Sequence, residues 1–292
     1  MLAQQLVNGV LLGATYALFA LGFTLMFGVL RVVNLTYGFY FTVGAFLSLG
    51  LARAGLPIVA ALPLAAIGAG LVAVVVDALL LTRLRRARAP ELASLMVTLG
   101  AVLALNALMT TVFSSDIRRL PPELIGADAL QFAGLRITAA QILIVGATIV
   151  LVGGLVALMR GTRLGLAIRA MAERPDAAGL MGIDTARLSA LVSFLSGALG
   201  GAGGVLIGLN FNAIHPYMGE TMMLRGFVVI IVGGLGDIRG ALIAGLLLGI
   251  VEVITAGYVA SDLKDAVAFA IMVGVLWTRP SGLFGRAVVR RA

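Results

Sequence analysis

The 292-residue chain contains no cysteine, a single histidine (His215) and a single lysine (Lys264). Without cysteine it can form no disulfide and no cysteine-ligated metal site, and one histidine cannot build a multi-histidine site. We therefore expect no metal and no cofactor. The chain also lacks the GxxxxGK[ST] phosphate-binding loop, and its serines show no nucleophile pattern with histidine and a carboxylate. We predict that it is not an enzyme.

Charged residues are scarce as well. They make up 12% of the chain, against 61% hydrophobic residues, and the mean hydropathy is +1.12. Soluble domains are about 25% charged and 45–50% apolar, so a soluble fold would have too little polar surface. A bilayer core of roughly 30 Å needs about 20 helical residues per crossing. The composition predicts an all-α, polytopic transmembrane helical bundle of about eight spans, within a range of seven to ten, formed as a single transmembrane domain over residues 1–292.

Apolar runs with few or no charges mark the expected spans: 5–30, 32–52, 54–76, 92–115, 137–159, 188–209, 222–236, 240–259 and 264–278. The short run 222–236 is predicted to re-enter without crossing, which gives eight crossings. Arginines follow these runs in three blocks: Arg83, Arg85, Arg86 and Arg88; Arg160, Arg163, Arg169, Arg174 and Arg187; and Arg279, Arg286, Arg290 and Arg291. The positive-inside rule places all three blocks in the cytoplasm. It places the loop 116–136, whose positive and negative charges cancel, outside. The net charge of +8 therefore indicates a lipid membrane and no nucleic-acid partner.

Glycine is abundant, with 38 residues. Gly200, Gly204 and Gly208 repeat at four-residue spacing, which places them on one helix face and predicts close backbone packing. Two further stretches, 31–38 and 233–240, interrupt apolar runs with glycine and polar residues. Interrupted helices in both halves of a chain indicate a translocation path, although two tight interfacial turns would look the same.

Polar residues near these interruptions are the candidates for the path. We predict that it is lined by Asn34, Thr36, Tyr37, Gly38, Asn210 and Glu252. Glu252 either faces a polar cavity or caps a helix end, and Asp77 lies either within the membrane or at its interface. No opposed acid and base are expected at mid-span, and His215 is expected in a solvated loop.

The loop of about 160–187 is longer than a connection requires. Pro175 suits the first position of a helix, Asp176 favours its positive end, and Gly182 supplies a stop. Asp184 is then expected to cap the next helix. The loop is predicted to hold a short helix at the cytoplasmic surface. This helix is either free at the interface or, as we prefer, a docking element for a cytoplasmic partner.

The stretch from Asp176 through Ala177 and Ala178 to Gly182 resembles the coupling-loop signature of ABC importer permeases. Residues 22–38 and 233–242 look like the branched-chain amino acid (LIV-type) permease family, and the similarity covers residues 8 to about 285. This resemblance implies that the residues that couple the permease to the ATPase are Arg174, Pro175, Asp176, Ala177, Ala178 and Gly182.

The resemblance implies a permease subunit in the cell (inner) membrane that imports branched-chain or related amino acids. Its implied partners are cytoplasmic ABC ATPase subunits, a second, paralogous permease subunit and a periplasmic or extracellular substrate-binding protein. The sequence departs from relatives at 35–37, where alanine and histidine often precede the glycine, which leaves urea or amides open as substrates. The competing interpretation is a self-contained channel or ion-coupled carrier that uses Glu252 and Asp77 as ion ligands.

Overall fold

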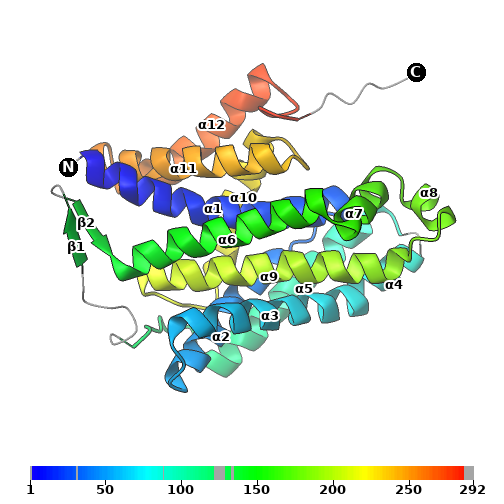
Figure 1. Ribbon diagram of the computed structural model, residues 1–292, viewed down its shortest axis with the longest axis horizontal. Helices are drawn as coiled ribbons and strands as arrows, with labels where there is room; N and C mark the ends of the chain where they lie inside the picture. The colour runs from blue at the N-terminus through cyan, green and yellow to red at the C-terminus, as the bar shows by residue number, and fades with distance from the viewer. Residues whose placement is uncertain (1, 31, 88, 122–128, 133–134, 286–292) are drawn as a thin grey trace.

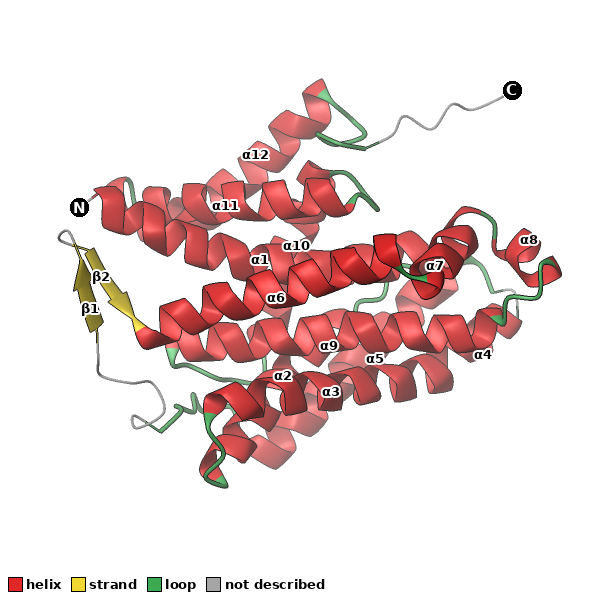
Figure 2. Ribbon diagram, in the orientation of Figure 1, coloured by secondary structure: helices red, strands yellow, loops and turns green. Residues whose placement is uncertain are grey.

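The computed structural model describes residues 2–30, 32–87, 89–121, 129–132 and 135–285. In chain order the elements are α1 (Leu2–Leu30), α2 (Tyr37–Arg53), α3 (Ile58–Val76), the π-helical turn η1 (Asp77–Leu81), α4 (Thr82–Arg86), α5 (Glu91–Phe113), β1 (Ala129–Phe132), β2 (Leu135–Thr138), α6 (Ala139–Gly161), α7 (Arg163–Glu173), α8 (Pro175–Leu180), α9 (Thr185–Phe211), α10 (Met218–Gly233), α11 (Ile238–Tyr258), the 3₁₀ turn η3 (Ser261–Leu263) and α12 (Lys264–Thr278). Figure 2 shows that the strands of the described chain form one antiparallel hairpin, which lies at the end of the bundle beside the N-terminus. The predicted polytopic helical bundle is confirmed.

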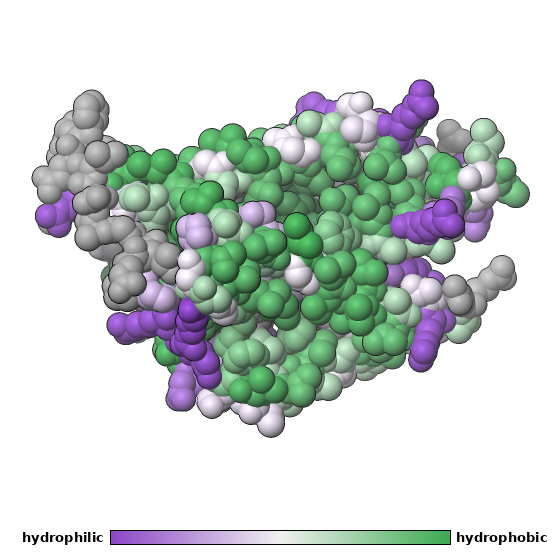
Figure 3. Space-filling model, turned by 60° about the horizontal axis from the view of Figure 1, so that its bottom comes forward, coloured by the Kyte–Doolittle hydropathy of each residue, from purple (hydrophilic) through white to green (hydrophobic). Residues whose placement is uncertain are grey.

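The long helices run along the longest axis of the molecule (Figure 1). Helix α1 lies between α11 and α9, and α9 packs on its other sides against α2 and α3. Six helical stretches are long and apolar enough to cross a membrane: 2–30, 58–85, 92–113, 139–161, 185–211 and 238–258. Figure 3 shows a broad apolar zone between hydrophilic residues at the two ends, as expected of a surface that faces lipid.

Helices α2, α10 and α12 are shorter, with 17, 16 and 15 residues. Non-helical residues lengthen the path of the chain before two of these helices: residues 32–36 precede α2, and residues 212–217 precede α10. Tyr37 shows where α2 begins, because its hydroxyl donates to the carbonyl of Phe19 in the middle of α1 (2.9 Å). Counted with these three helices, the described chain passes between the two ends of the bundle nine times, within the predicted range.

The expectation that 222–236 re-enters without crossing is wrong. Gly219, near the start of α10, packs against Gly38 in the middle of the bundle. Gly233, at its other end, packs against Gly240, close to where Gly236 faces Gly28 at the end of α1. A 16-residue helix spans only about 24 Å, and the extended residues before it supply the remaining length.

The arginine blocks meet at one end of the bundle, as the topology prediction requires. Arg85 of the first block lines the same cavity as Pro175, which lies within the second. The chain after Arg279 returns to this end, where the amide of Leu283 donates to Val232. The opposite end carries the hairpin, where Gln4 pairs with the backbone of Arg136. Outside the described residues lie Arg31, Arg88, Glu123, Asp128, Arg286, Arg290 and Arg291.

Glycine brings the helices into backbone contact, as predicted for Gly204, whereas Gly200 and Gly208 pack against the side chains of Tyr37 and Ile214. A β-carbon placed on Gly204 would meet the carbonyl oxygen of Phe41, and one on Gly44 would meet the backbone of Gly201. On the other side of the bundle, a β-carbon on Gly13 would lie 2.7 Å from the α-carbon of Leu246. Helices α1, α2, α9 and α11 therefore touch through their main chains.

Candidate translocation path and coupling element

The first interruption, at residues 32–36, lies inside the protein. The side chains of Asn34, Thr36, Tyr37 and Tyr40 are fully buried. Thr36 donates its amide to the Asn34 side-chain oxygen (2.9 Å), and its hydroxyl contacts both this oxygen and the Tyr40 hydroxyl. Irregular backbone is tolerated at membrane depth when it is buried in protein, and here asparagine and threonine satisfy it locally. Of the two interpretations of this stretch, an interfacial turn is excluded.

The second interruption, at residues 233–240, is an interfacial turn. Residues 234–237 form a tight turn between α10 and α11, with positive φ at Gly234 (+108°) and Gly236 (+85°). Asp237 caps α11 by accepting the amide of Gly240 (2.8 Å). Leu235 in this turn is more than half exposed. This segment is a turn at the arginine-rich end rather than a broken helix inside the bundle.

The segment that meets the first interruption is residues 212–217, which precede α10. The entry into α10 meets the entry into α2: Gly38 and Gly219 are in backbone contact, and Thr42 accepts the amide of Gly219 (3.1 Å). Both helices therefore begin in the interior, at neighbouring positions. Discontinuous helices that meet at mid-depth are the usual place of a transporter's substrate site. Sequence reasoning found residues 32–36 and missed 212–217, because the latter stretch lies at the end of an uncharged run and looks like an external loop.

Glu252 belongs to a buried ionic network. Its carboxylate accepts the hydroxyl of Tyr16 (2.7 Å) and pairs with Arg225 (3.2 Å). Arg225 also reaches Asp265 at 3.3 Å, and its guanidinium lies 5.7 Å from the centre of the Tyr16 ring. The expectation of no opposed acid and base at mid-span is therefore wrong. The missed signal was available, since Arg225 is the one charged residue in the apolar run 222–236, and charges inside membrane segments are functional candidates.

A cavity of about 290 Å³ lies beside Arg225. It is lined by Phe41, Ile207, Phe211, Ala213, His215, Met218, Thr221, Met222, Arg225 and Lys264. His215 is therefore half-buried at a cavity rather than solvated in a loop. Asn210 is half-buried in the last turn of α9 and is not among the lining residues. The structure thus brings Asn34, Thr36, Tyr37 and Gly38 together, and places Glu252 and Asn210 in separate surroundings.

Asp77 is buried and fully paired. It lies in the π-helical turn η1, where Arg85 donates to both of its oxygens (3.0 and 2.8 Å) and Thr82 donates to one (3.1 Å). Its exposed fraction is 2%. This ion pair joins the end of α3 to α4 close to the arginine-rich end. Asp77 is therefore a structural anchor of the first arginine block.

The loop 160–187 has the local structure that its sequence predicts. Pro175 is the first residue of the short helix α8, and Gly182 has φ +83° just after its end. Asp184 caps α9 by accepting the amide of Arg187 (3.0 Å). The preceding helix α7 is amphipathic and buries Gly165, Ile168 and Met171 against the bundle.

Helix α8 stands out from the bundle at the arginine-rich end (Figure 1). Ala178 is buried at its base, whereas Leu180 and Met181 at its tip are 90% and 84% exposed. These two residues form the apolar tip of α8. Large apolar side chains exposed at this level are unusual on a polar membrane face and indicate a contact surface.

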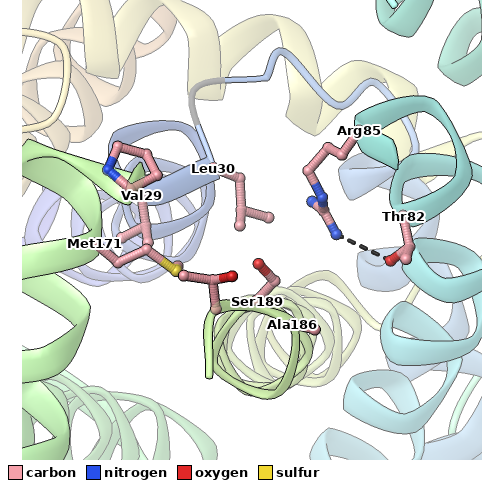
Figure 4. A pocket seen from close by; sticks show the side chains of 9 residues that line it. Val29, Leu30, Thr82, Arg85, Met171, Ala186 and Ser189 are labelled. Atoms are coloured by element: carbon pink, nitrogen blue, oxygen red, sulfur yellow. Dashed lines mark hydrogen bonds between the residues drawn. The ribbon is translucent and has the colours of Figure 1, made fainter. Parts of the chain in front are cut away.

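A cavity of about 280 Å³ separates this element from the membrane helices. Figure 4 shows Met171 and Ser189 facing Val29 and Leu30 at the end of α1, with Arg85 and Thr82 across the cavity. Pro175 also lines it. Helices α7 and α8 are therefore in direct reach of α1, α4 and α9.

Spanning helices, an irregular segment satisfied inside the bundle and a surface element at the arginine-rich end together define a polytopic membrane transport protein. The chain belongs to the family described as branched-chain amino acid transport system / permease component, whose model matches residues 5–276. Membership confirms the family resemblance and the prediction of a permease rather than an enzyme. It also makes the chain one component of a larger transport system.

Named relatives cover nearly the whole chain. It is 32% identical to the high-affinity branched-chain amino acid transport system permease protein LivH of Escherichia coli K12, over 99% of this chain and 97% of LivH. It is 33% identical to BraD of Pseudomonas aeruginosa, with the same coverage, and 27% identical to a probable LivH of Methanocaldococcus jannaschii over 92% of this chain and 88% of that protein. No solved structure matches the chain significantly.

Proposed function

We propose that this chain is one of two permease subunits of an ABC importer in the cell (inner) membrane, and that the importer carries branched-chain or related amino acids into the cytoplasm. Cytoplasmic ABC ATPase subunits drive it, and a periplasmic or extracellular binding protein delivers the substrate. The names of the relatives support the substrate class. The observation that carries the assembly is the apolar tip of α8, Leu180 and Met181, exposed at the arginine-rich end, which is cytoplasmic by the positive-inside rule.

In this proposal Arg174, Pro175, Asp176, Ala177, Ala178 and Gly182 form the coupling element. A force on α8 reaches α9 directly, because only residues 181–184 connect the two helices. Met171 faces the end of α1 in the cavity of Figure 4, and Pro175 is among the residues that line this cavity. Since α1 and α9 touch their neighbours through glycine, small displacements are passed on as movements of whole helices.

The ion-coupled carrier is not favoured by the geometry. It needs carboxylates that can bind a cation, but Glu252 is held by Tyr16 and Arg225, and Asp77 by Arg85 and Thr82. Paired carboxylates have no vacant oxygen for an ion unless an ion pair breaks, and breaking a buried pair is costly. ATP-driven import leaves both pairs intact.

Purification of the chain in mild detergent from its native membrane tests the assembly. We expect an ABC ATPase and a second permease to copurify in near-equal amounts, and the reconstituted complex to take up radiolabelled leucine with ATP and binding protein. Uptake of urea in place of leucine would change the substrate assignment alone. A stable homo-oligomer without an ATPase, carrying an ATP-independent flux, would overturn the proposal.

Polar substitution of the apolar tip of α8 tests docking. We expect the double variant Leu180→Ser/Met181→Ser to copurify with several-fold less ATPase, because exposed apolar residues in the centre of an interface carry much of its affinity. Leu92→Ser is the control, since Leu92 is an exposed leucine at the start of α5 near the first arginine block. Normal recovery of the ATPase with the double variant would contradict a docking role.

Gly182→Ala tests coupling. Its φ of +83° costs a residue with a β-carbon about 1–2 kcal/mol, although no atom within 4 Å would obstruct that carbon. We expect the strain to shift α8 relative to α9, so that uptake falls about tenfold while ATP hydrolysis continues. Gly179→Ala is the control, because Gly179 lies inside α8 with equally open surroundings. Equal uptake per ATP in both variants would exclude this role for Gly182.

A further inference from the structure

The cavity beside Arg225 has chemistry that the coupling mechanism does not use. Its volume of about 290 Å³ is at the lower end of the range for small-molecule sites. Its floor is buried, with Phe41 fully enclosed and Met222 3% exposed, whereas Phe211 and Thr221 at the rim are exposed. The cavity is therefore a concave site that can be reached from the surface of the chain.

Two cations, Lys264 and Arg225, are among the lining residues. Lys264, the first residue of α12, forms no ion pair with any carboxylate of the described chain. Arg225 is paired through one nitrogen with Glu252 and Asp265, but its Nε is buried and has no hydrogen-bond partner among the described residues. An ammonium and a guanidinium donor without complete partners form a site for an anionic group, and charged hydrogen bonds of this kind are strong.

Most of the other lining residues are apolar. Among them, Phe41, Ile207 and Met222 come from α2, α9 and α10. A ligand that fits this lining has one carboxylate and a short aliphatic group, and it is small enough for this volume.

We propose that this cavity binds the amino acid in transit, with Lys264 and Arg225 holding its α-carboxylate and Phe41, Ile207 and Met222 enclosing its aliphatic side chain. The inference rests on the proposed function and adds the residues that recognise the substrate. The site lies next to the contact of Gly38 with Gly219, because Phe41 and Met222 follow these glycines by one helical turn.

The absence of cysteine in the natural chain allows a direct binding test. Thr221→Cys places one thiol at the rim of the cavity, and its rate of labelling by a membrane-impermeant maleimide is measured on the purified full-length chain. We expect leucine at about four times its Kd to slow labelling about fivefold, because only the unoccupied fraction reacts. Leucinol, which has the same side chain and ammonium but no carboxylate, is expected to protect far less.

Lys264→Gln in the Thr221→Cys background tests the carboxylate contact. We expect leucine to bind about ten- to a hundredfold more weakly, the range for loss of a charged hydrogen bond. Protection is measured for each variant relative to its own labelling rate without leucine, because removal of a nearby cation also changes the reactivity of the thiol. Arg119→Gln is the matched control, since Arg119 is an exposed cation outside the cavity. Ser115→Cys, an exposed position outside the cavity, is expected to react equally with and without leucine.

The outcomes separate the two proposals. Absence of leucine protection in a chain whose complex still imports leucine would overturn the binding site and leave the proposed function standing. Equal protection by leucine and leucinol, or full protection in Lys264→Gln, would overturn the carboxylate contact. Protection of a chain that imports no leucine in its complex would overturn the proposed function and support the binding site.

Discussion

Arg225→Met is expected to destabilise the protein by about 3–5 kcal/mol, the cost of leaving a buried charge without its partner. Glu252 is only 5% exposed, and the variant leaves its carboxylate with the Tyr16 hydroxyl but without a cation. The loss also removes the ion pairs that join α10 to α11 and α12, because Arg225 pairs with residues of both. We expect this to be the most damaging single charge removal in the described bundle.

The measurement is the free energy of unfolding of the purified chain in mixed micelles with increasing SDS. The double variant Arg225→Met/Glu252→Gln is expected to recover most of the loss, since it removes both charges while glutamine can still accept from Tyr16. Arg187→Met is the control: its pair with Asp184 is solvated, with side chains 90% and 52% exposed, and such pairs contribute about 1 kcal/mol or less. A double variant as unstable as Arg225→Met would show that the ion pair is not the cause.

Gly204→Ala is expected to destabilise the protein by about 3 kcal/mol, although alanine is the better helix former. The added carbon would overlap the carbonyl oxygen of Phe41, which is a backbone atom and cannot rotate away. Helix α2 would have to move off α9 along the face where Gly44 and Gly201 also touch. Because α2 begins at the buried interruption, this movement also disturbs the hydrogen bonds of Asn34 and Thr36.

Gly153→Ala supplies a control of opposite sign. Gly153 lies in α6 with no atom within 4 Å of an added β-carbon, so alanine there should stabilise the helix by up to about 1 kcal/mol. Both variants are compared with the natural chain by the same SDS titration and by thermal aggregation in detergent. Destabilisation of similar size in both would mean that glycine content, rather than the contact with Phe41, sets the stability.

The proposed roles explain why the membrane charges are arranged as they are. A substrate-binding protein can supply the affinity of an importer, so the permease needs only a weak site through which substrate passes. One unpaired lysine and one partly satisfied arginine beside apolar side chains are compatible with weak binding. The buried carboxylates are used instead to hold helices together.

Several features of this protein follow from short stretches of its sequence. Apolar runs long enough to cross a bilayer determine the six long spanning helices, and the position of the arginines determines which ends lie together. Pro175, Gly182 and Asp184 determine the beginning and end of α8 and the start of α9, because caps act through backbone groups only a few residues away. The interruption at 32–36 is also local, since Asn34 and Thr36 bond to each other.

Only the tertiary structure decided which polar groups meet. Tyr16 and Glu252 are 236 residues apart in the chain, and Arg225 joins them because α1, α10 and α11 pack with particular faces together. Sequence spacing reveals that a charge lies in an apolar run, but its partner depends on helix rotation and on contacts between backbones at glycine. The same physical reason applies to His215 and Lys264, which line one cavity because α10 and α12 meet there, and to residues 234–237, which form a turn because α10 ends at the arginine-rich face.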